Sequence, residues 1–171
     1  MKDHFAMFAS YNRWANRRLY AAAGALPDSE YRTPRGAFFG SLHGTLNHLV
    51  VADRIWLRRF TGEGPLQTKL DEVLFEDFDA LDAAREVEDA RIVAYIGGLS
   101  EADLTTTFTY RTIVQPKDVT QPLAPALAHF FNHQTHHRGQ AHGLLSAIGG
   151  NAAAPALDLI LYQRETGVGL S

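Results

Sequence analysis

The stretch that decides the interpretation of this chain is His129-Phe-Phe-Asn-His-Gln-Thr-His-His-Arg-Gly-Gln140. It lies within residues 123–148, whose apolar residues recur with a helical period. On a helix, His133 and His137 are four residues apart, so their rings leave the same face one turn apart. Phe130 falls on that face too, which directs both imidazoles into an expected hydrophobic core. Imidazoles are costly in such a core unless their nitrogen atoms have partners.

Apolar residues recur at three- and four-residue steps in four long segments, which is the pattern of helices with one buried face. The expected helices cover residues 2–25, 41–60, 80–96 and 122–148. Ser41 suits the N-cap of the second helix, and glycines follow the ends of the second, third and fourth. Four long helices favour an all-α fold, a four-helix bundle, with residues 1–171 forming a single domain.

Shorter segments connect and follow these helices. Residues 105–113 are rich in β-branched side chains in alternation, which predicts a short strand. Residues 115–118 would turn the chain back, giving a small hairpin before the fourth long helix. Residues 156–165 are expected to form a short last helix, and residues 27–40, rich in Gly, Pro, Arg and Ser, to form a connector.

The same periodicity predicts which side chains face inward. In the third long helix, the expected core face consists of Leu81, Ala84, Val87, Arg91 and Tyr95. The expected exposed side of that helix carries the acidic residues Asp82, Glu86, Glu88 and Asp89. His43 on a polar stripe and His142 on the opposite face from His133 are expected to point into solvent.

Composition excludes several classes of protein. A net charge of −3, with 16 basic and 19 acidic residues, gives no electrostatic basis for nucleic-acid binding. The absence of cysteine excludes disulfides, thiolate metal sites and a cysteine nucleophile within the chain. No apolar run approaches the ~18 residues of a membrane span, and the N-terminus has no signal-peptide pattern. We therefore expect a soluble cytoplasmic protein that acts on small molecules.

The histidines predict a site for a divalent metal ion. Three neutral imidazoles from two helices are sufficient to hold such an ion and leave a position open, and zinc and nickel both suit imidazole. His133 and His137 would supply two ligands, and His48, on an apolar flank of the second helix, would supply the third. Helical geometry alone does not exclude His129 and His136, which lie near the direction of His133. The Glu-x-x-His pairs of di-iron bundles and the zincin motif are absent.

Three motifs, in this order, give the chain a resemblance to the DinB/YfiT-like superfamily of metalloenzymes. They are Tyr11-Asn-Arg-Trp-Ala-Asn16, Leu46-Asn-His-Leu-Val-Val-Ala-Asp-Arg-Ile-Trp-Leu57 and His133-Gln-Thr-His-His-Arg-Gly-Gln140. The resemblance implies a four-helix bundle of up-down-down-up topology, which is often a homodimer. It also implies a nickel or zinc ion held by one histidine of the second helix and two of the fourth. These positions are His48, His133 and His137 in this sequence.

Related members of the superfamily include transferases and isomerases that use a low-molecular-weight thiol such as bacillithiol or mycothiol. The resemblance therefore implies an enzyme in which a bound metal lowers the pKa of such a thiol. Asp53, Arg138 and Gln140 are candidates to orient the metal ligands, and ordinary packing or salt-bridge roles are equally open to them. Two other functions remain: metal-assisted hydrolysis with water as the nucleophile, and metal or ligand binding without turnover.

Overall fold

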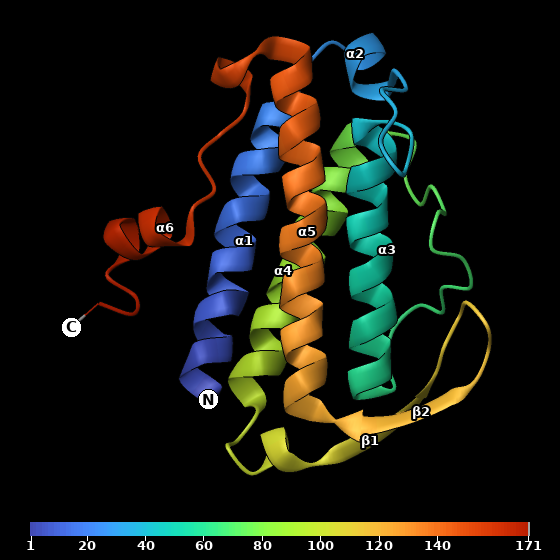
Figure 1. Cartoon of the computed structure of the whole chain (residues 1–171), viewed down its shortest axis with the longest axis vertical. Helices are drawn as coiled ribbons and strands as arrows, with labels where there is room; N and C mark the ends of the chain where they lie inside the picture. The colour runs from blue at the N-terminus through green and yellow to red at the C-terminus, as the bar shows by residue number, and fades with distance from the viewer. Residues whose placement is uncertain (171) are drawn as a thin grey trace.

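Four long helices lie side by side in the computed structural model, which describes residues 1–170 (Figure 1). They are α1 (Lys2–Gly24), α3 (Leu42–Thr61), α4 (Phe78–Gly98) and α5 (Leu123–Gly149). Helices α1 and α5 run in one direction, and α3 and α4 run in the opposite direction (Figure 1). Both α1 and α3 contact α4 and α5. Within the described residues, no helix is long and apolar enough to cross a membrane.

Short elements complete the chain. They are α2 (Asp28–Arg32), the 3-10 turns η1 (Asp103–Thr105) and η2 (Asn151–Ala153), strands β1 (Thr107–Arg111) and β2 (Asp118–Pro122), and α6 (Leu159–Thr166). The strands form an antiparallel hairpin in which Thr107 pairs with Pro122 and Tyr110 with Val119. The hairpin crosses one end of the long helices, and α6 lies beside α1 (Figure 1). The prediction of a mainly helical fold with a small hairpin is confirmed.

Local sequence sets the ends of the helices. The Ser41 side chain accepts a hydrogen bond from the Gly44 N–H at 3.1 Å, so the predicted cap of α3 is present. Gly62 ends that helix with a φ of 77°, a conformation that suits glycine. The connector at residues 27–40 differs from the prediction, because it contains the short helix α2, which is anchored by the buried side chain of Tyr31.

The interior has two hydrophobic clusters separated by a polar layer. One cluster includes Phe5, Leu57 and Phe130, and the other includes Leu19 and Leu46. Seven polar side chains between these clusters, each at most 3% exposed, are linked in one network of hydrogen bonds and ion pairs. We call these residues the polar layer: Asn12, Asn16, Asp53, Arg85, Asp89, Gln134 and Arg138.

Ion pairs and hydrogen bonds connect the four helices within the polar layer. Arg85 of α4 pairs with Asp53 of α3 at 2.6 Å and with Asp89 of its own helix at 3.1 Å. The Asn16 side chain of α1 donates to Asp89 at 2.9 Å, and Gln134 of α5 donates to Asp53. Buried charges are tolerated when they are paired with opposite charges in this way.

The predicted core face of α4 is therefore wrong in part. Val87, expected inside, is 58% exposed, whereas Glu88 and Asp89, expected outside, are 2% and 1% exposed. Glu88 is buried because Arg54 of α3 donates to it at 2.8 Å and Arg91 donates to it at 2.6 Å. Partners supplied by other helices thus turn the acidic side of α4 inward.

Candidate metal centre

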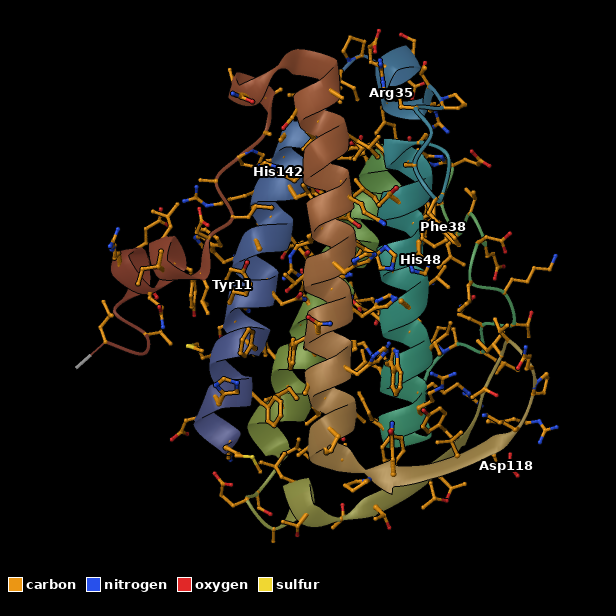
Figure 2. The ribbon with its side chains drawn as sticks, viewed as in Figure 1. Tyr11, Arg35, Phe38, His48, Asp118 and His142 are labelled. Carbon is orange, nitrogen blue, oxygen red and sulfur yellow. The ribbon has the colours of Figure 1, made fainter. Side chains whose placement is uncertain are left out.

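His48 of α3 and His133 and His137 of α5 converge at one place; we call them the histidine triad. One nitrogen from each ring lies within 4.8 Å of the other two. The Nε2 atoms of His133 and His137 are 3.1 Å apart. Two nitrogen atoms bound to one zinc ion at ~2.0–2.1 Å would be separated by roughly this distance. The position of His48, between α3 and α5, can be followed in Figure 2.

The His48 ring is held from two sides. Its Nδ1–H donates to the backbone oxygen of Leu70 at 2.7 Å, which leaves Nε2 as the nitrogen with a free lone pair. The Phe39 ring stacks on it with centroids 3.8 Å apart and an interplanar angle of 17°. Nε2 is buried and has no hydrogen-bond partner. A metal ion at the triad would give this nitrogen the partner that it lacks.

The His137 ring is oriented from within α5. Its Nδ1–H donates to Gln140 Oε1 at 2.8 Å, so the lone pair of Nε2 is directed at His133. The Gln140 amide also lies 3.1 Å from His136 Nε2, to which it donates. A side-chain oxygen on the outer nitrogen of a metal-binding histidine is a common arrangement, because it fixes the tautomer.

Burial keeps the triad uncharged at neutral pH. Burial, with a smaller contribution from the nearby His137 ring, outweighs the opposing hydrogen bond to Leu70 and lowers the pKa of His48 to about 4. Burial together with the neighbouring imidazoles lowers the pKa of His133 to about 3. Burial also lowers the pKa of His137. Neutral imidazoles have the lone pairs that metal coordination requires, so the triad has the chemistry of a cation site.

The three residues expected to support the ligands lie in different surroundings. Gln140 contacts His137 directly. Asp53 belongs to the polar layer, where it accepts from Gln134 and pairs with Arg85. Arg138 donates to Asn12 of α1, and its guanidinium lies 5.3 Å from the centroid of the Tyr11 ring. Gln140 therefore contacts a member of the triad, whereas the hydrogen bonds and ion pairs of Asp53 and Arg138 are made with other residues.

The remaining histidines of the two helices do not belong to the triad. His129 and His136 are exposed, and the cluster that could hold a metal ion does not include them. His43 is only 7% exposed and donates to the Phe75 oxygen at 2.9 Å, so its predicted exposure is wrong. The segment between α3 and α4 covers this stripe of α3 and supplies the acceptor. His142 is half-buried on the α1 side of α5 (Figure 2).

A cavity of about 280 Å³ lies beside His48 and His133. Its other walls come from α3 and from the turn of the hairpin, including Trp56, Arg59 and Ile113. Sequence reasoning did not connect these residues to the site. Phe39 is one of two adjacent phenylalanines in the connector, an apolar signal for a buried contact, whereas the Leu70 contact uses a backbone atom that carries no sequence signal.

Replacing Gln140 with leucine should weaken metal binding by about 10–100-fold, the usual effect of removing an outer hydrogen-bond partner from a ligand histidine. The His137 ring would lose the acceptor that fixes its Nδ1–H. Competition with a chromogenic chelator measures the affinity. Asn132→Leu, at an exposed position of α5, is the matched control and should bind metal as the parent does. Equal affinities in the two variants would contradict this role for Gln140.

Gly44 allows the connector to pass against α3 on its way to His48. A Cβ atom at this position would lie 2.1 Å from the Phe39 backbone oxygen. Gly44→Ala should therefore displace Phe39 from the His48 ring and lower the free energy of unfolding by ~1–3 kcal/mol. Urea unfolding measures that loss. Gly139→Ala on α5, where a Cβ meets nothing within 4 Å, is the control and should not destabilise the fold.

Nearly the whole chain is similar in sequence to known proteins. The model of the DinB family matches residues 1–167. The Protein DinB of Bacillus subtilis (strain 168) is 25% identical over 174 residues, which cover 97% of this chain and 98% of that protein. The matched range includes all three histidines of the triad.

Proposed function

Because this chain belongs to the DinB family, we propose that it is a divalent-metal enzyme built on a four-helix bundle. In this proposal, His48, His133 and His137 bind the metal ion, and the enzyme transfers a low-molecular-weight thiol to an electrophilic small molecule. The observation that carries the proposal is the convergence of three uncharged imidazoles, one of which has a buried nitrogen without a partner.

The metal in this proposal is nickel or zinc. Both are well suited to imidazole ligands, and three protein ligands leave at least one coordination position for an exchangeable group. A divalent ion in such a site lowers the pKa of a thiol or water molecule that occupies the open position. The chain itself orients the imidazole rings so that their lone pairs point to one place. The backbone oxygen of Leu70 accepts a hydrogen bond from His48, and the side chain of Gln140 accepts one from His137.

Two observations favour a thiol over water as the nucleophile. The chain has no cysteine, so a reacting thiol would arrive from outside, and the cavity beside His48 and His133 offers space next to the triad. Among the described residues, the cluster that could hold a metal contains histidines alone. Hydrolysis would benefit from a carboxylate base at the ion, and Asp53, the first carboxylate after His48 along α3, is instead engaged by Arg85 and Gln134 in the polar layer.

The test is conjugation of a thiol to the fluorogenic electrophile monochlorobimane. In this reaction the sulfur–carbon bond forms, chloride leaves, and the thiol proton passes to solvent. Protein purified without a tag or chelator is loaded with zinc or nickel and assayed with cysteine, glutathione, bacillithiol and mycothiol. We expect conjugation above the uncatalysed rate with at least one thiol. His137→Ala should lose both the bound metal and this rate.

Other outcomes identify the alternatives. One metal ion per chain with no conjugation by any thiol would favour a binding protein without turnover. Metal-dependent cleavage of an ester or amide without added thiol would favour a hydrolase. Absence of stoichiometric metal in the untreated protein, and failure to take up added zinc or nickel, would contradict the metal site itself.

The proposed enzyme is a homodimer, in line with the resemblance described above. Sedimentation equilibrium at several protein concentrations tests this assembly. A single species with the 18.9 kDa mass of one chain would contradict it.

A further inference from the structure

Arg59 of α3 lies between two aromatic rings next to the candidate metal centre. Its guanidinium carbon is 4.6 Å from the centroid of the Trp56 ring and 4.5 Å from that of Tyr110 on β1. The side chain is half-buried. Trp56 in turn contacts His129, with ring centroids 5.1 Å apart. The aromatic rings hold the guanidinium in place but provide no anion to balance its charge.

Within residues 1–170, the charge of Arg59 has no acidic partner. Among residues 1–170, no carboxylate lies within ion-pair distance of its guanidinium, whereas Arg54 pairs with Glu88 and Arg111 with Asp118. Its protein acceptor is the Arg111 backbone oxygen, at the long distance of 3.4 Å. A guanidinium has five N–H donors, so most of those on Arg59 remain available. Consistently, burial lowers the pKa of Arg59 because it disfavours the charged form.

Arg59 lines two cavities at once. One is the cavity of about 280 Å³ beside His48 and His133, and the other has a volume of about 340 Å³. Ile55 and Ile113 line both cavities as well. Arg59 therefore stands with the two isoleucines at the boundary of two neighbouring cavities, one of which reaches the triad. A ligand in the cavity beside the triad would place one polar group on Arg59 and its apolar part on the two isoleucines.

We propose that Arg59 binds the acidic group of a small organic anion and thereby selects anionic substrates for the site beside the triad. The inference rests on the proposed function, since it names the substrate class of that site. The acidic group is a carboxylate or a phosphate, both of which accept two parallel N–H bonds from a guanidinium. Either anion would supply the charge that Arg59 lacks within the protein.

Three probes of similar shape test this assignment: benzoate, phenyl phosphate and uncharged benzamide. Calorimetric titration measures their binding to zinc-loaded protein. We expect at least one anion to bind more tightly than benzamide, and Arg59→Gln to weaken that anion by about tenfold or more. Benzamide binding should be the same in both proteins. The stronger of the two anions distinguishes a carboxylate from a phosphate substrate.

Two further variants make the result specific. Arg59→Lys keeps the charge and should recover part of the anion affinity, which separates loss of charge from loss of fold. Arg164→Gln removes the same charge from an exposed position on α6 and should leave anion binding as in the parent. Equal weakening by Arg59→Gln and Arg164→Gln would show a diffuse charge effect and overturn the proposal.

The metal ion itself is the competing site for an anion. If both anions bind zinc-loaded protein equally with and without Arg59, and binding disappears after chelation, the anion is held by the metal and the proposal is wrong. If Arg59-dependent binding is found but no thiol is conjugated, the anion site stands and the thiol-transfer function fails. The two proposals can therefore fail separately.

Discussion

Replacing His48 with alanine should abolish stoichiometric binding of zinc or nickel. The variant keeps His133 and His137 on α5 but loses the ligand that comes from α3, so the remaining pair lacks a third imidazole. The loss of affinity should exceed the ~10–100-fold that follows removal of an outer partner such as Gln140. Elemental analysis of protein dialysed against zinc measures the effect, with an expected change from one ion per chain to almost none.

Thermal unfolding gives an independent measurement of the same loss. A ligand that binds only the folded chain at 100 times its Kd stabilises it by ~2.7 kcal/mol. For a chain of this size, zinc should then raise the Tm of the parent protein by about 5–10 °C. The Tm of His48→Ala should not respond to zinc, whereas His142→Ala, on the α1 side of α5, should respond as the parent does. A zinc-dependent rise in His48→Ala would contradict the role of His48.

Replacing Arg85 with methionine should have the largest effect on stability. Methionine replaces the aliphatic part of the side chain but removes the cation between Asp53 and Asp89. Removing one partner of a buried ion pair typically costs ~3–5 kcal/mol, because the other charge is left uncompensated. Urea unfolding measures this loss. Arg17→Met is the matched control, since Arg17 forms an exposed pair with Glu86 on the surface of the same helices, and surface pairs contribute at most ~1 kcal/mol.

The effect of Arg85→Met should also depend on pH. In the parent, burial outweighs the opposing effect of Arg85 and raises the pKa of Asp53 to about 7. Without Arg85 the pKa rises further above the value of ~3.9 in the unfolded chain. A group with a raised pKa binds more protons in the folded state, so stability is lost as the pH rises above ~4. The variant should therefore differ more from the parent at pH 8 than at pH 5, and a difference that shrinks with pH would contradict this mechanism.

The parts of the fold and site that the sequence predicted depend on local spacing. The four-residue separation of His133 and His137 places them one turn apart on any helix, and Ser41 caps the helix that begins next to it. His48 is identified as the third candidate ligand by its position on an apolar flank of its helix and by the family resemblance. The helical periodicity of α5 gives no information about a third ligand on another helix.

The parts that the sequence did not predict depend on contacts between distant segments. Glu88 and Asp89 were assigned to solvent because a hydrophobic pattern cannot show that Arg54 and Arg85 neutralise them. His43 was assigned to solvent because its acceptor is a backbone oxygen more than thirty residues away. The contact of Phe39 with His48 likewise depends on the path of a connector without periodicity.

The polar layer sets the axial register of the four helices. If α3 slid along α5 by one turn, about 5.4 Å, Asp53 would leave Gln134 and Arg85 and enter one of the hydrophobic clusters. Such a shift would move a charged side chain from its partners into apolar surroundings, which costs free energy. The polar layer therefore opposes the shift far more strongly than a layer of leucines, which can exchange neighbours, would. Gln134 adjoins His133, and Asp53 lies little more than one turn after His48. The hydrogen bond from Gln134 to Asp53 therefore keeps the three imidazoles at the same height along the helix axes.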